Sequence, residues 1–254
     1  MIFRKGLLQE APTAVEVDLN IDNVMQLKGA PVNATASQDD NRAADVPAGA
    51  LERVDKLEAI DPRAFYIGQV RMNFTTNADS RRSVDLSKFI DENRQLITSM
   101  TGELQWDYGN GLVTLNAPAA QGALGFLQRA RTVTLPAMTL ETSNEFGSVL
   151  LVAMDDKPLS ESGRILLQVM TEQKNHDWSA PGTGMREIKD LGRPPVLVRA
   201  FNGTVRLTRS DASDLRVTAL DWDGYPQATW TNAARIALLP DAPYYVIESA
   251  AQAE

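Results

Sequence analysis

Aspartate and glutamate are the residues of this chain that could catalyse a reaction without a cofactor or another type of side chain. Hydrolysis of a glycosidic bond requires two of them, one acid and one base or nucleophile, about 5–10 Å apart. The candidate catalytic residues are Glu103, Glu145 and Asp223. Glu145 follows Asn144, and an Asn-Glu pair at a strand end is a position that hydrolases use. Because the chain has 33 acidic residues, chance pairs are expected, and the sequence singles out no pair.

The same acids also suggest a calcium site. Asp155-Asp156 and Asp221-Trp222-Asp223-Gly224 place oxygen ligands on tight turns, as hard cations require. The candidate metal ligands are therefore Asp155, Asp156, Asp221 and Asp223. Neither stretch matches the full EF-hand loop, and the favoured alternative is ordinary turn chemistry, in which Asp side chains bind nearby backbone N–H groups. A structural calcium ion is the one cofactor that the sequence suggests.

Aromatic residues are the candidates for ligand binding. Several adjoin Gly, Asp, Asn or Pro rather than lying in apolar runs; the candidates are Trp106, Tyr108, Trp178, Trp222 and Tyr225. A flat ring exposed on a β surface stacks on the C–H face of a sugar, while neighbouring Asp or Asn side chains bind its hydroxyls. The alternative is that these rings are core residues, which is the commoner role of tryptophan.

Other reaction classes are excluded by residue counts. The only histidine, His176, lies in a polar stretch expected to be an exposed loop, and there is no cysteine. These counts argue against a histidine-based triad or zinc site and exclude disulfides, thiolate metal sites and a cysteine nucleophile. Neither a Walker-type phosphate loop nor a dinucleotide-binding fingerprint is present.

Strands must position these side chains, because strand patterns recur about every ten residues and long helical patterns do not. Near the N-terminus, Val15, Val17 and Leu19 alternate with Glu16 and Asp18, which predicts a half-buried strand. The further strand candidates are 69–74, 103–107, 111–116, 131–140, 148–154, 164–171, 195–200, 204–209, 215–221, 235–239 and 244–248.

Turn residues complete this prediction. Asn202-Gly203 favours a type I′ hairpin between 195–200 and 204–209, and Asp107–Gly111 is a second hairpin candidate. The best helix candidate starts after Asp85 as N-cap. The predicted fold is an all-β antiparallel sandwich, jelly-roll-like, with one or two short helices.

Composition divides the chain into two regions. Residues 1–62 are expected to form an N-terminal extension with short strands and a flexible polar loop at 35–50, and residues 63–254 the main sandwich domain. The net charge of −8 argues against a nucleic-acid or anionic-membrane partner. No segment reaches the length of a membrane span, and the start MIFRKGLLQE is not a signal peptide. An export signal would therefore lie upstream on a longer parent chain.

A set of short stretches carries a family resemblance. They are 2–10, 96–127, 149–178, 188–207, 215–226 and 239–248, including LITSMTGELQWDYGNGLVTLNAPAAQGALGFL at 96–127. Together they resemble the C-terminal β-rich region of large bacterial glycoside-hydrolase-like proteins, where it follows a (β/α)-barrel catalytic domain. The resemblance implies an extracellular or periplasmic polysaccharide-degrading protein whose catalytic acids lie in the upstream barrel.

Three functions follow as hypotheses. The first is an accessory β-sandwich domain that binds polysaccharide or packs on the barrel. The second is a free-standing glycoside hydrolase that uses two carboxylates. The third is a structural β module without affinity for glycans. Turnover by the pure protein distinguishes the second hypothesis, and glycan affinity distinguishes the first from the third.

Overall fold

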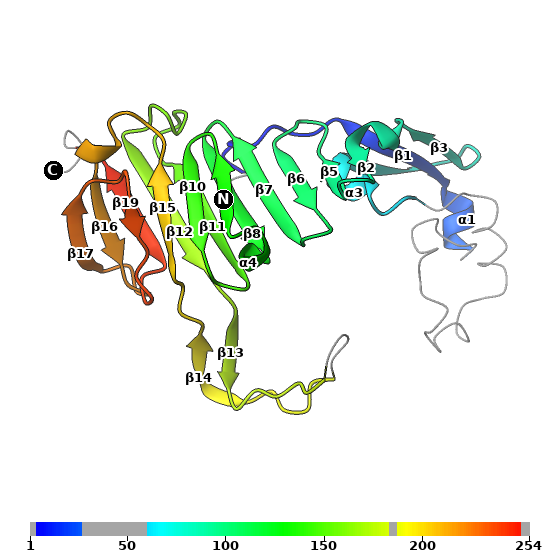
Figure 1. The fold of residues 1–254 in the computed structure, drawn as a ribbon. Coiled ribbons are helices and arrows are strands. Elements are labelled where there is room, and N and C mark those ends of the chain that lie inside the picture. The colour runs from blue at the N-terminus through cyan, green and yellow to red at the C-terminus, as the bar shows by residue number, and fades with distance from the viewer. Residues whose placement is uncertain (1–3, 27–59, 183–186, 250–254) are drawn as a thin grey trace. The chain divides into compact units, whose positions relative to one another are not determined.

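The computed structural model describes residues 4–26, 60–182 and 187–249 (Figure 1). It contains two compact units, a smaller one of Glu10–Trp106 and a larger one of Met1–Gln9 with Asp107–Glu254. This division differs from the one expected at residue 62. The reason lies in strand β1, which finds its hydrogen-bonding partners in strands beyond that residue. The predicted loop at 35–50 lies outside the described residues.

The described elements of the smaller unit are short. In chain order they are β1 (Thr13–Asn20), α1 (Ile21–Met25), α3 (Ala64–Ile67), β2 (Gln69–Thr75), β3 (Ser80–Ser83), the 3₁₀ helix η2 (Leu86–Phe89), β4 (Ile90–Asp91) and β5 (Leu96–Thr98), with β6 (Leu104–Asp107) ending at the boundary.

The larger unit is built almost entirely of strands. Its elements are β7 (Leu112–Ala117), β8 (Ala120–Gly125), α4 (Leu127–Ala130), β9 (Thr132–Leu135), β10 (Met138–Thr142), β11 (Gly147–Ala153), β12 (Arg164–Met170), β13 (Gln173–His176), β14 (Arg193–Val198), β15 (Gly203–Leu207), the 3₁₀ helix η3 (Ala212–Asp214), β16 (Arg216–Leu220), β17 (Pro226–Thr231), β18 (Ile236–Ala237) and β19 (Tyr244–Glu248).

Two sheets of the larger unit form a sandwich. One contains the strands in the order β17-β16-β19-β12-β11-β8-β7, and the other is the four-stranded sheet β18-β15-β10-β9. The strand pairs of both sheets in this unit are antiparallel. The expected all-β sandwich with short helices is therefore confirmed.

The core lies between these two sheets because alternate residues of their strands are apolar. On β12, Ile165, Leu167 and Val169 are buried, and they join one cluster with inward residues of the opposite sheet such as Leu140 and Val205. A single continuous cluster of this kind is the main source of stability for a sandwich.

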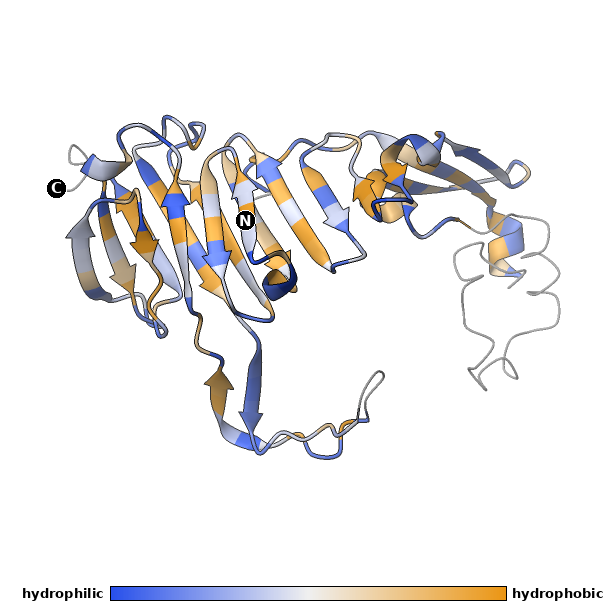
Figure 2. Ribbon diagram, viewed as in Figure 1, coloured by the Kyte–Doolittle hydropathy of each residue, from blue (hydrophilic) through white to orange (hydrophobic). Residues whose placement is uncertain are grey.

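Strands β13 and β14 form a separate two-stranded sheet that projects from the sandwich as an arm (Figure 1). Every residue of β14 is exposed, including Val196 and Leu197. In Figure 2 the hydrophobic β14 contrasts with the hydrophilic β13 beside it. The arm therefore contributes little to the core.

The smaller unit contains the sheet β2-β1-β3, in which β1 pairs in parallel with β2 and antiparallel with β3. As the sequence predicts, Val15, Val17 and Leu19 of β1 are buried, whereas Glu16 and Asp18 point to the other face. The parallel pair is a departure from the expected all-antiparallel pairing. Within the described ranges, no helix has the length and apolar character needed to cross a bilayer.

A polar network covers the second face of this sheet. Asn73 Nδ2 donates to Glu16 Oε1 and to Asp18 Oδ1, both at 2.9 Å. Ser80 Oγ donates to Asp18 Oδ2 at 2.8 Å, and Arg82 pairs with both carboxylates. The hydrogen bonds from Asn73 are the largest cause that holds the pKa of Glu16 and the pKa of Asp18 below their ordinary values.

Some local predictions are wrong. The Asn202-Gly203 pair does not close a hairpin, because β14 pairs with β13 while β15 pairs with β10 and β18. Asn144 explains this: its Oδ1 accepts from Asn202 N at 2.7 Å, and its Nδ2 donates to Ala200 O at 2.8 Å. These bonds tie the segment to the end of β10. The predicted strand 131–140 is two strands, β9 and β10.

The helix predicted after Asp85 is only the 3₁₀ turn η2, followed directly by β4. Its N-cap is nevertheless as expected, since the Asp85 carboxylate accepts a hydrogen bond from Ser87 N. Tertiary pairing of Ile90 and Asp91 with β5 ends the helix early.

Candidate functional site

The candidate site is organised by the turn Asp221–Tyr225, which joins β16 to β17. The carboxylate Oδ1 of Asp221 accepts from the backbone N of Asp223 at 3.0 Å and of Tyr225 at 2.8 Å. Gly224 adopts a φ of 87°, which a residue with a Cβ rarely adopts. Asp221 is therefore committed to holding the turn, as the turn interpretation of the sequence expects.

This turn presents aromatic rings to solvent. Trp222 is 48% exposed and Tyr225 is 70% exposed, while Asp223 between them is also exposed. One side of Trp222 lines a shallow depression together with Val198 and Arg199 at the base of the arm. Part of the indole thus packs against the sandwich, and the rest is available for contact with a ligand.

Charged side chains surround the guanidinium of Arg199 beside this ring. Arg199 Nη2 lies 2.8 Å from Glu172 Oε1, and Nη1 lies 3.5 Å from Glu145 Oε2. The backbone at the base of the arm is fixed by Thr171 Oγ1, which donates to Arg199 O at 2.5 Å, and by Arg199 N, which donates to Glu172 O at 3.1 Å. The resulting surface combines an exposed indole with both donors and acceptors of hydrogen bonds.

We call this set the arm-base surface and define it by Trp222, Arg199, Glu145 and Glu172. Glu145 and Trp222 are candidates that the sequence predicts, and the structure connects them through Arg199. The sequence does not predict Arg199 and Glu172 as site residues. Glu172 precedes β13 and Arg199 follows β14, and only the pairing of these two strands brings them together. A prediction that β13 pairs with β14 would have found them.

The other candidate catalytic acid, Glu103, is buried in the smaller unit with 7% exposure. Glu145 and Asp223 belong to the larger unit, where Glu145 pairs with Arg199. Neither unit therefore contains the three acids as one cluster. A mechanism with two carboxylates stays a prediction that the arrangement of these residues does not favour.

The acids predicted at the second turn have structural partners. Asp155 Oδ1 accepts from Ser162 Oγ at 2.6 Å, and its Oδ2 accepts from Gly163 N at 2.8 Å. Burial opposes ionisation of Asp155, but these hydrogen bonds outweigh it and hold the pKa of the carboxyl below its ordinary value. Asp156 is exposed and has a positive φ of 58°. Asp155 thus closes the loop between β11 and β12.

Among the residues that the structure describes, no group of three or more His, Cys, Asp or Glu side chains is placed to hold a metal ion. The calcium site stays a prediction.

The remaining candidate aromatics lie in different surroundings. Trp106 stacks on Tyr66 with ring centroids 4.3 Å apart, and Tyr108 is half-buried. Trp178 is half-buried beyond β13, with Lys174 Nζ 5.1 Å from its ring centroid. His176 ends β13 and is exposed, as expected, although it belongs to a strand rather than to a loop. Trp222 and Tyr225 are therefore the predicted rings that the fold presents together.

Comparison with protein-family models, with characterised proteins and with solved structures finds no match to this chain.

Proposed function

We propose that this chain is an accessory β-sandwich module of a polysaccharide-degrading, glycoside-hydrolase-like protein and that it contacts glycan through the arm-base surface and Tyr225. The observation that carries the proposal is the exposure of Trp222 next to the Arg199 ion pairs. An exposed indole stacks on the C–H face of a sugar ring, and the guanidinium and carboxylates supply directional hydrogen bonds to its hydroxyls.

The geometry favours binding over catalysis. Hydrolysis needs an acid and a second carboxylate on either side of the scissile bond, and one of the pair usually has a raised pKa. The guanidinium of Arg199 instead bridges Glu145 and Glu172, so these two carboxylates do not flank an open space for a scissile bond. Their remaining lone pairs can accept hydrogen bonds from sugar hydroxyls. In this proposal, catalysis belongs to an upstream barrel domain of an exported parent protein.

Affinity gel electrophoresis with and without soluble polysaccharides tests the proposal. The native protein is expected to be retarded by at least one glycan. Trp222→Ala should abolish this retardation while changing the stability by less than about 1 kcal/mol, because half of the ring is already in water. Leu124→Ala is the matched control, since Leu124 has the same 48% exposure on β8 but no ring to stack.

A second variant, Arg199→Gln, removes the cation that holds both carboxylates and should also weaken retardation. Loss of retardation only in proportion to unfolding would assign Trp222 to packing and favour the structural module. Release of reducing sugar by the pure protein would instead favour the free-standing hydrolase.

A further inference from the structure

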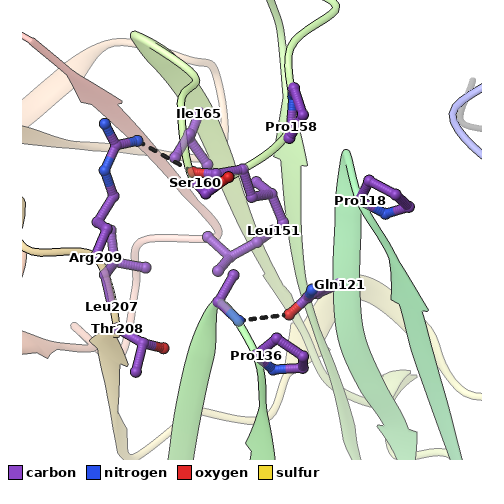
Figure 3. A pocket seen from close by; sticks show the side chains of 12 residues that line it. Pro118, Gln121, Pro136, Leu151, Pro158, Ser160, Ile165, Leu207, Thr208 and Arg209 are labelled. Atoms are coloured by element: carbon purple, nitrogen blue, oxygen red, sulfur yellow. Dashed lines mark hydrogen bonds between the residues drawn. The ribbon is translucent and has the colours of Figure 1, made fainter.

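The larger unit contains a hollow that the arm-base surface does not use. It lies among the turns that follow β7, β9, β11 and β15, and its volume of about 230 Å³ is that of about eight water molecules in the liquid (Figure 3). The hollow is lined by Pro118, Gln121, Pro136, Ala137, Leu151, Pro158, Leu159, Ser160, Ile165, Leu207, Thr208 and Arg209. Its surface is therefore largely aliphatic, with a few polar groups.

Gln121 supplies a polar group from the wall of this hollow. Its residue exposure is 5%, and its Oε1 accepts a hydrogen bond from Ala137 N at 2.8 Å (Figure 3). Because a backbone N–H can only donate, this bond fixes the side-chain oxygen on Ala137 and leaves Nε2 on the other side. Within the described part of the chain, no protein group accepts a hydrogen bond from that Nε2. Nε2 is not among the fully buried atoms that lack a partner, so it keeps contact with solvent and can donate to an occupant of the hollow that accepts a hydrogen bond.

The positive charge of Arg209 at the wall of the hollow is neutralised by its ion pair with Asp211. Its Nε and Nη2 donate to the two oxygens of Asp211 at 2.6 and 2.8 Å, and its Nη1 donates to the backbone oxygens of Leu159 and Ser162. The guanidinium thus already has a bidentate carboxylate and two carbonyl acceptors. It does not select an anion, and no carboxylate lines the hollow to select a cation.

We propose that this hollow binds a small uncharged molecule that joins a compact aliphatic body to one carbonyl acceptor, as lactams and lactones do. The aliphatic body contacts Leu151, Ile165 and Leu207, and the carbonyl accepts a hydrogen bond from Gln121 Nε2. Ser160 and Thr208 are exposed at the mouth. The site is separate from the proposed glycan surface, so either proposal can fail without the other.

The test is an NMR titration of the full chain with ε-caprolactam, observing the backbone amides and the Gln121 side-chain amide. Azepane is the control ligand, because it has the same ring without the carbonyl and is protonated at neutral pH. Saturable shifts of Gln121, Leu151 and Ile165 are expected with ε-caprolactam and not with azepane. Gln121→Met should weaken binding about tenfold, the value of one hydrogen bond.

Thr208→Trp decides the question if Gln121→Met does not fold. This exposed position lies at the mouth, where a tryptophan blocks entry, and Ser210→Trp is the matched control outside the lining. Binding should be lost in Thr208→Trp and kept in Ser210→Trp. The proposal is overturned by non-saturable shifts in the native chain, by equal binding of azepane, or by unchanged affinity in Thr208→Trp.

Discussion

The two units of this protein solve the problem of stability in different ways. The larger unit buries one continuous apolar cluster between two sheets. The smaller unit buries a small cluster of Val15, Val17, Leu19, Ile60 and Ala64, and it covers the other face of its sheet with paired charges. Apolar burial is insensitive to pH, whereas paired carboxylates stabilise only while they are ionised. The units should therefore respond differently to core truncation and to acid.

The pKa directions sharpen this contrast. Carboxyl groups with a lowered pKa in the smaller unit are Glu16, Asp18, Asp61 and Asp85, and those in the larger unit are Asp155 and Asp211. The smaller unit combines more of these groups with a smaller core. Acid should accordingly affect the smaller unit first.

Truncation of the large core should have the largest effect. Leu167→Ala removes a fully buried side chain from the middle of β12 and should reduce the free energy of unfolding of the larger unit by about 3–5 kcal/mol. Urea unfolding followed by fluorescence in a Trp106→Phe background reports on the larger unit, which contains the remaining tryptophans. Leu124→Ala is the exposed control on β8. A loss as small as that of the control would contradict a core centred between these sheets.

A glycine substitution compares backbone packing in the two units. A Cβ at Gly122 would lie 2.3 Å from Val149 O, and one at Gly68 in the smaller unit would lie 2.7 Å from Pro12 O. Gly122→Ala should therefore destabilise by about 1–3 kcal/mol, and Gly68→Ala by less. Melting temperatures of the two variants test the order. A larger effect at Gly68 would show that the smaller unit is packed as tightly as the sandwich.

Acid should unfold the smaller unit before the larger one. The expected change in the free energy of unfolding is smaller than for the core and glycine substitutions above. Because the folded pKa values of Glu16 and Asp18 lie below the ordinary 4.5 and 3.8, their stabilisation is present above those values and is lost as the pH falls through the lower folded values. Fluorescence of Trp106, which stacks on Tyr66, should report loss of the smaller unit before the larger unit unfolds.

Asn73→Ala removes the main donor to both carboxylates and should flatten this acid dependence. Thr229→Ala, an exposed position in the larger unit, serves as its control. Two results would contradict the prediction that ionised carboxylates stabilise the smaller unit more than the larger one. They are simultaneous unfolding of both units in acid and an acid dependence that Asn73→Ala leaves unchanged.

Much of the fold was predictable because alternation of apolar residues is a local signal. The strands around Val149 and Leu167 show it clearly, and both lie where expected. Strand β8 was missed, since its glycines hide the alternation, although they are required where backbones approach closely, as at Gly122. The false hairpin at Asn202 has a similar origin: the turn preference is local, but Asn144 overrides it from a distant strand.

The candidate site was predictable in its rings and not in its charges. Trp222 and Tyr225 adjoin an Asp-Gly turn that is visible in the sequence, and the turn forms as expected. Arg199 and Glu172 are brought together only by the pairing of β13 with β14. Pairing between two segments without apolar alternation is a non-local property, which a single sequence does not encode in a readable pattern.

The projecting arm has a consequence for the colloidal behaviour of the protein. β14 places Val196, Leu197 and Val198 in solvent in a two-stranded sheet, a combination that normally invites strand-by-strand growth into aggregates. Pro194 and Pro195 stand at its start, and because neither has an N–H group, neither can donate to an incoming strand. Pro194 and Pro195 thus protect the arm against pairing with strands of other molecules. Solubility at high concentration should depend on these two prolines more than on the net charge of −8.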